Sequence, residues 1–130
     1  ALKLSISELI GKRPVYVDYS TRYSVTFESY SLNQIGICYQ LKHQKGGGSG
    51  VPDLSGWDMY SLRGISGDMF FRDLDTDKAI LIYAYSHIEA GETLLSLGRF
   101  EEARKQLMIA EQISPEMKGQ VSKIRASYGI

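Results

Sequence analysis

Apolar and small residues recur at helical spacing in the last third of the chain. Over residues 84–117 most of them lie three or four positions apart, and most positions between them are polar or charged. The recurring residues are Ala84, Gly91, Leu94, Gly98, Phe100, Ala103, Leu107, Ala110, Ile113 and Pro115. A period near 3.6, broken once by glycine, predicts two helices joined by a tight turn.

Capping residues and helix breakers set the expected bounds of these helices. We expect the first helix to run from about Asp77 to Leu97, with acidic residues at its start and Gly98 as its stop. Glu101 and Glu102 open the second helix. A third helix begins at Pro115, with Ser114 as its cap. Its apolar face, predicted to cover the hairpin, steps by four, three and four through Met117, Val121, Ile124 and Tyr128.

Alternation of apolar and polar residues predicts strands in the first third of the chain. The segments are Val15–Asp18, Tyr23–Tyr30 and Ile35–Leu41. Before them, Ser5 and Glu8 form a capping-box pattern that predicts a short helix ending at Gly11. The predicted fold class is therefore α+β. We expect a small N-terminal sheet with one short helix, packed on a C-terminal tetratricopeptide-like helical hairpin that has a third capping helix.

We expect one compact domain over residues 1–130, because a lone helical hairpin cannot bury its own apolar face. Its expected parts are a small α/β part (1–44), a Gly/Ser linker (45–51), an irregular segment (52–78) and the helical part (79–130). The run Gly46–Gly50 reads Gly-Gly-Gly-Ser-Gly, which fits either an engineered splice or a natural loop.

Composition narrows the classes of partner. Hydrophobic residues make up 43% of the 130 residues, as in an ordinary globular protein, and 15 basic residues balance 15 acidic ones. This neutral balance removes the broad attraction on which nucleic-acid binding depends. No apolar run approaches the length of a membrane span, so we expect no direct insertion into a bilayer. Cys38 lies in an alternating apolar stretch and is expected to be a half-buried strand residue.

The motifs that carry chemistry are incomplete. Asp73-x-Asp75-x-Asp77 begins like a calcium loop, but Lys78 replaces the required glycine and Ala84 the required glutamate. Helix capping is the better interpretation. His87 begins an H-x-E triplet without the cysteines of a zinc deaminase, so we expect a packed, hydrogen-bonded histidine. We therefore predict no catalytic residue, no metal ligand and no cofactor in this chain.

The helical pattern resembles one tetratricopeptide-type hairpin. In arrays of such hairpins the first helix of each repeat lines a binding groove. The resemblance implies partner-binding positions at Tyr85, Ile88, Glu92 and Leu95. A large concave groove normally takes about three repeats, and only one is present, so peptide capture is the weaker implication and structural packing the stronger.

A second resemblance covers most of the chain. The motifs that carry it are Trp57–Tyr60, Leu62–Ile65 and Phe71–Thr76 before the hairpin, with Arg13–Val17 and Gly36–Leu41 in the first third. In order and spacing these resemble the C-terminal soluble region of bacterial polytopic membrane proteins. Those proteins are glycosyltransferase-like and distantly similar to protein O-mannosyltransferases. The resemblance implies that the catalytic acidic residues lie in the membrane portion and its first extracytoplasmic loop, and nothing in this chain corresponds to them.

Three hypotheses about function follow. The first is a non-catalytic accessory or interaction domain that binds a protein or the membrane portion of its own parent chain. It would lie on the extracytoplasmic (periplasmic) face, or in the cytoplasm if the resemblance does not hold. The second is a carbohydrate-active enzyme or glycan-binding domain with a cleft around Tyr16, Asp18 and Arg22. The third is a structural cap that holds an oligomer together.

Overall fold

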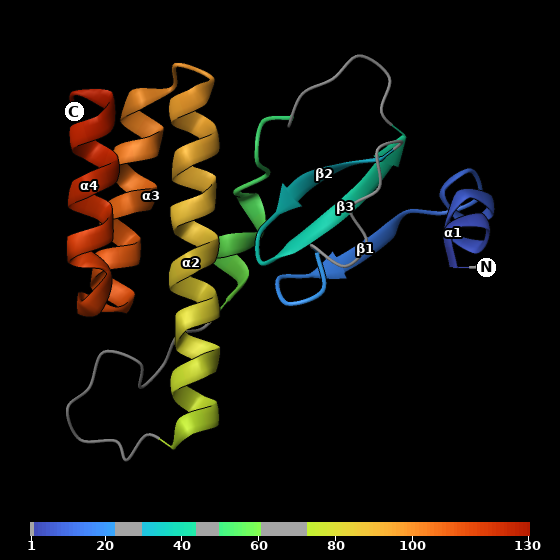
Figure 1. Ribbon diagram of the computed structural model, residues 1–130, viewed down its shortest axis with the longest axis horizontal. Coiled ribbons are helices and arrows are strands. Elements are labelled where there is room, and N and C mark those ends of the chain that lie inside the picture. The colour runs from blue at the N-terminus through green and yellow to red at the C-terminus, as the bar shows by residue number, and fades with distance from the viewer. Residues whose placement is uncertain (1, 23–29, 44–49, 61–72) are drawn as a thin grey trace. The chain divides into compact units, whose positions relative to one another are not determined.

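The computed structural model describes residues 2–22, 30–43, 50–60 and 73–130, with side chains from Ile6 onward (Figure 1). Helices and strands are segregated along the chain, which confirms the predicted α+β class. The elements are α1 Leu2–Ile10, β1 Val15–Asp18, β2 Tyr30–Ile35, β3 Cys38–His43, the 3-10 helix η1 Ser55–Met59, α2 Leu74–Ser96, α3 Phe100–Ile113, the 3-10 helix η2 Pro115–Met117 and α4 Lys118–Tyr128.

The chain divides into two compact units. The first is Ala1–Trp57, which contains α1 and the sheet, and the second is Asp58–Ile130, which contains α2, α3 and α4. The expectation of a single domain, in which the sheet packs on the hairpin, concerns the arrangement of these units and stays a prediction.

The sheet of the first unit has the order β1-β3-β2, and both pairings are antiparallel. Val15 lies opposite Leu41, and Leu32 lies opposite Leu41 on the other side, so these side chains share one face. This face forms the core with α1. The core consists of the buried residues Ile6, Tyr30 and Leu41 and the partly buried Ile10, Val15, Val17 and Leu32. Alternation in β1 is therefore what directs its two valines inward.

A tight hairpin joins β2 and β3 and corrects one predicted strand. Ile35 pairs with Cys38, which leaves Gly36 and Ile37 as a two-residue loop. Gly36 has a φ of 59°, the backbone region that glycine enters without steric cost and that type II′ hairpin turns require at this position. The predicted strand Ile35–Leu41 is therefore wrong across the turn, because the alternation continues through a reversal of the chain. Cys38 is partly buried in a strand, as predicted.

The other N-terminal predictions have mixed outcomes. β1 occupies Val15–Asp18 as predicted. Helix α1 ends at Ile10, just before Gly11, but it begins at Leu2. Ser5 therefore lies inside the helix, and the predicted capping box is wrong. The predicted strand Tyr23–Tyr30 lies outside the described residues except for Tyr30, which begins β2. Residues 45–49 of the predicted Gly/Ser linker also lie outside them.

Helices α2 and α3 form an antiparallel hairpin in the second unit (Figure 1). A Cβ atom placed on Gly91 would lie 3.0 Å from Cγ and Cδ2 of Leu107, so glycine permits the close approach of the two helices. Ala103 and Leu107 of α3 are fully buried in this packing. The small residues of the helical pattern are therefore the ones at which the helices meet.

The turn between the two helices closes on Gly98, as predicted. Gly98 has a φ of 75°. Its N–H donates to the carbonyl of Leu95 (3.0 Å), and the N–H of Arg99 donates to that of Leu94 (2.9 Å). This is the Schellman pair of hydrogen bonds, which satisfies the last carbonyls of a helix. Arg99 then forms a two-bond contact with Glu102 in the first turn of α3, with both N···O distances 2.7 Å.

The start of α2 lies three residues before the predicted one. Asp73 is the N-cap, and its carboxylate accepts a hydrogen bond from the N–H of Thr76 at 2.7 Å. Hydrogen bonds from Thr76 lower the pKa of Asp73. The sequence offers several acidic candidates, and the first of them caps the helix. The interpretation of this acidic run as a helix cap is thereby confirmed.

The third helix is also shifted from its prediction. Ser114 makes no side-chain cap, and Pro115–Met117 forms a 3-10 turn before α4 begins at Lys118. Of the predicted apolar face, Met117, Val121 and Ile124 are buried. Tyr128 is 45% exposed, so its assignment to that face is wrong.

Exchange of Gly91 for alanine tests the helix contact. We expect Gly91→Ala to lower the free energy of unfolding by about 1–3 kcal/mol, because the added methyl group must displace the fully buried Leu107. Gly119→Ala in α4 is the matched control. A Cβ there meets nothing within 4 Å, so helix propensity alone should stabilise the protein by about 0.5–1 kcal/mol. Urea unfolding measures the free energy of unfolding of each variant. An equal increase in the two variants would contradict the close approach of α2 and α3.

Removal of the Asp73 carboxylate tests the cap. We expect Asp73→Ala to cost about 1 kcal/mol in urea unfolding, because the N–H of Thr76 loses its partner. Asp73→Asn keeps an acceptor oxygen and should cost less. Asp75→Ala, in the same first turn, removes a charge without removing this hydrogen bond. A larger loss in Asp75→Ala than in Asp73→Ala would place the cap elsewhere.

Candidate functional site

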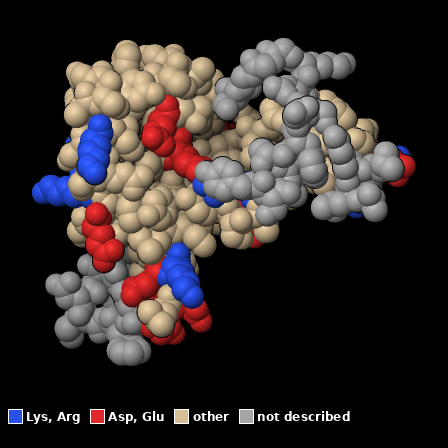
Figure 2. Space-filling view, viewed as in Figure 1, with Lys and Arg blue, Asp and Glu red and all other residues tan. Residues whose placement is uncertain are grey.

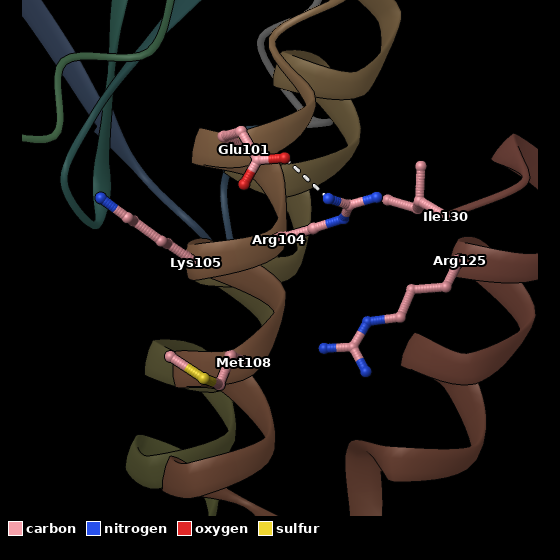
Figure 3. A pocket seen from close by; sticks show the side chains of 6 residues that line it. All are labelled: Glu101, Arg104, Lys105, Met108, Arg125 and Ile130. Atoms are coloured by element: carbon pink, nitrogen blue, oxygen red, sulfur yellow. Dashed lines mark hydrogen bonds and ion pairs between the residues drawn. The ribbon is translucent and has the colours of Figure 1, made fainter.

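A hollow of about 500 Å³ lies against α3 and α4 in the helical unit (Figure 3). Its lining residues on α3 lie three, four and seven positions after Glu101, so all of them share one face of that helix. The second wall comes from the last turn of α4 and the residues after it. The lining residues are Glu101, Arg104, Lys105, Met108, Arg125 and Ile130.

Two arginines extend into this hollow from different helices, Arg104 from α3 toward Ile130 and Arg125 from α4 toward α3 (Figure 3). Arg104 donates to Glu101 at 2.7 Å, and Nη1 of Arg125 lies 3.5 Å from a carboxylate oxygen of Glu111. The side chain of Glu101 is 81% exposed, so solvent weakens its hold on Arg104. A guanidinium group has five N–H donors, and one carboxylate engages only some of them. Both arginines therefore keep capacity for a further acidic group.

The hollow also presents apolar surface. Met108 is 47% exposed, and Ile130 is partly exposed on the opposite side. Its lining holds three cationic residues and one carboxylate. Elsewhere on the visible face of the helices the two signs of charge are interspersed (Figure 2). A cationic surface with an unbranched, adaptable thioether beside it suits a partner that is both acidic and apolar.

The partner-binding positions implied by the tetratricopeptide resemblance lie on a different helix, α2. Tyr85 is partly exposed and Glu92 is exposed, whereas Ile88 and Leu95 are buried, with 1% and 3% of their surfaces accessible. Although the Glu92 side chain is exposed overall, partial desolvation of its carboxyl group, and secondly the charge of Glu89, raise its pKa. Two of the four positions thus present side chains to a partner, and partner binding there stays a prediction.

The hollow on α3 and α4 does not follow from the sequence pattern. Basic residues lie around Met108 in the sequence, but their spacing does not indicate that Arg125 of α4 lines the same hollow as Arg104 of α3. That juxtaposition depends on the way α4 folds back after Pro115.

The three residues proposed for a glycan cleft do not converge. Tyr16 and Asp18 alternate with the inward valines of β1 and are exposed. Arg22 is buried, with its guanidinium carbon 3.6 Å from the ring centre of Tyr19 and 5.6 Å from that of Tyr39, an inward-facing residue of β3. It therefore lies on the opposite side of the sheet from Tyr16. Glycan binding stays a hypothesis without an assembled cleft.

Asp18 has a local structural role. Its Oδ1 accepts hydrogen bonds from the hydroxyl and the N–H of Thr21, both at 2.7 Å, and from the hydroxyl of Ser20 at 2.9 Å. These bonds stabilise the carboxylate and lower the pKa of Asp18. Such a group closes the turn after β1 and is a poor proton donor.

His87 is packed and hydrogen-bonded, as predicted. It is 3% exposed, and its Nδ1 lies 2.7 Å from Oε1 of Gln106 on α3. Burial lowers the pKa of His87, and the hydrogen bond to Gln106 only partly opposes this effect. The ring is therefore neutral, with an Nδ1–H that donates to Gln106 and ties the two helices together. Within the described ranges, no three His, Cys, Asp or Glu residues gather as metal ligands.

None of the described helices has the length and hydropathy of a membrane span. Comparison with known proteins gives no match to a family model, to a curated protein or to a solved structure.

The buried His87 predicts a pH dependence of stability. Its folded pKa lies below the unfolded value near 6.5, so the unfolded chain binds a proton first as the pH falls. We expect the contribution of His87 to the free energy of unfolding to be fully present above pH 6.5 and to decrease as the pH is lowered from there. His87→Asn, which retains a donor, should flatten this decrease.

Urea unfolding of the wild type and of His87→Asn on both sides of that pH measures the effect. The difference between the two proteins is the relevant quantity, because the raised pKa of Glu92 acts in the opposite direction at lower pH. His43→Asn is the matched control, since His43 is exposed. An unchanged slope in His87→Asn would contradict the assignment.

Proposed function

We propose that this chain is a non-catalytic interaction domain whose helical unit binds an acidic, partly apolar segment of a partner protein. The observation that carries the proposal is the hollow on α3 and α4, which Arg104, Lys105 and Arg125 line together with the exposed side chain of Met108. Arginine and methionine are both enriched at protein interfaces, and charge complementarity favours acidic partners.

The packing of the hairpin supports a binding role. The hydrogen bond from His87 to Gln106 and the contact of Gly91 with Leu107 hold α2 and α3 together on one side of α3. Arg104 and Met108 lie on another side of that helix and are exposed. A rigid helix that presents side chains in fixed positions loses little conformational entropy on binding.

The proposal extends to the parent protein. We propose that this domain is part of a glycosyltransferase-like membrane protein of a bacterium and lies on the extracytoplasmic face, with a tetratricopeptide-type hairpin as its helical unit. The support is the sequence resemblance, together with the small residues at the α2–α3 contact. Membrane-spanning helices in the same reading frame would agree with this placement, and a neighbouring cytoplasmic domain in that frame would oppose it.

A random peptide library displayed on phage tests the binding role. We expect enriched peptides to combine aspartate or glutamate with apolar residues, and their binding to weaken with added salt. The double variant Arg104→Gln, Arg125→Gln should lower the affinity of such a peptide at least about fivefold, because two charge-assisted contacts are lost.

The matched control removes two charges from exposed positions of α4, Lys118→Gln and Lys123→Gln, and should bind like the wild type. Equal losses in the two double variants would show a non-specific charge effect and contradict the proposed site. A loss confined to Tyr85→Ala would place the partner on α2 instead.

A further inference from the structure

A second hollow, of about 380 Å³, lies in the N-terminal unit. It is formed where the segment after α1 runs beside the end of β3. Four of its nine lining residues are lysine, arginine or histidine, and none is acidic. The lining consists of Ile10, Gly11, Lys12, Arg13, Pro14, Gln40, Leu41, Lys42 and His43.

The strand register explains why these basic residues meet. β1 begins at Val15, opposite Leu41 of β3, and the two strands are antiparallel. The last two residues of β3, Lys42 and His43, therefore extend past the start of β1. Arg13, two residues before Val15, lies beside them in the same hollow. Two segments far apart in the sequence thus bring their positive charges to one place.

The turn after α1 holds Lys12 and Arg13 in position. Their backbone N–H groups both donate to the carbonyl oxygen of Leu9, each at 2.9 Å. These bonds also satisfy a carbonyl at the end of the helix, whose partial negative charge would otherwise oppose an anion. The loop backbone is therefore fixed, and the two side chains extend from an anchored turn.

No described residue forms an ion pair with the three cations of this hollow, Lys12, Arg13 and Lys42, and all three are exposed. The identified ion pairs join Lys78, Arg99, Arg104 and Arg125 to carboxylates of the helical unit. On the neighbouring strand, β2 places Ser31 beside Lys42 and Tyr30 beside His43, so neither neighbour is acidic. Like charges that line one hollow repel one another, and a bound anion relieves this repulsion.

We propose that this hollow binds a phosphate group carried by a larger molecule. Arginine matches the tetrahedral oxygens of phosphate with two parallel hydrogen bonds, and lysine adds point charges. A volume of about 380 Å³ exceeds that of a phosphate ion and leaves room for an attached organic group. The amide of Gln40 and the partly exposed side chain of Ile10 line the remainder. The inference is independent of the binding surface on α3 and α4.

Binding of pyrophosphate and of a lipid headgroup by the full chain tests this proposal. Isothermal titration with sodium pyrophosphate measures a soluble phosphate ligand. Flotation with phosphatidylcholine vesicles, with and without phosphatidylglycerol, measures a headgroup. The triple variant Lys12→Gln, Arg13→Gln, Lys42→Gln should lower the affinity at least about tenfold in the arm that shows binding, because charge-assisted hydrogen bonds are lost at three residues.

The matched control is Lys78→Gln, Lys118→Gln, Lys123→Gln, which removes the same charge from exposed positions of the helical unit. It should bind within about twofold of the wild type, since these lysines lie outside the hollow. Thermal unfolding by circular dichroism checks that both variants are folded.

If pyrophosphate binds saturably and only the triple variant in the hollow loses this binding, the result would support a soluble phosphate ligand. Flotation that requires phosphatidylglycerol and is lost in the same variant would support a headgroup. Binding in neither arm, or an equal loss in both triple variants, would overturn the proposal.

Discussion

The close approach of α2 and α3 at Gly91 is the contact on which the helical unit depends. Without a side chain at this position, Leu107 fits against the backbone of α2 and becomes fully buried. Because a helix is rigid, fixing Leu107 inward also fixes which residues of α3 point outward. Arg104 and Met108 are three residues before and one residue after it, so they reach the surface beside α4. One missing methyl group therefore determines the orientation of the candidate binding surface.

Regular spacing in the sequence predicts the helices well, but it predicts less well the residues at which elements begin, end or turn. Helices α2, α3 and α4 follow from spacing, whereas the start of α2 depends on which of several acidic residues binds a backbone N–H, and Asp73 does so. The alternation around Gly36 continues through a chain reversal, so period alone predicted one strand where the structure has a turn. Tyr128 has the right spacing for the buried face but lies at the end of α4, where the packing stops.

The candidate sites were harder to predict than the fold, because each depends on contacts between distant segments. Arg104 and Arg125 line one hollow only because α4 folds back, and Arg13 and Lys42 line another only because of the register between β1 and β3. Spacing is also ambiguous on α2, where partner binding stays a prediction. Ile88 has the spacing of a groove residue in a tetratricopeptide-type hairpin, but an apolar side chain at that spacing also suits a core, and it is buried. Periodicity gives the face of a helix and does not give its solvent exposure.

The balance of 15 basic and 15 acidic residues describes the whole chain and conceals how those charges are distributed. In the helical unit, cations are largely neighboured by carboxylates one turn away, as Arg104 is by Glu101. At the end of β3, Lys42 and His43 lie beside residues of β2 and of the segment before β1 that are basic, neutral or apolar. Since ionic screening limits charge effects to about 10 Å, binding responds to this local excess and not to the total. A neutral composition therefore argues against a long-range field around the molecule, and it is compatible with two local surfaces that attract anions.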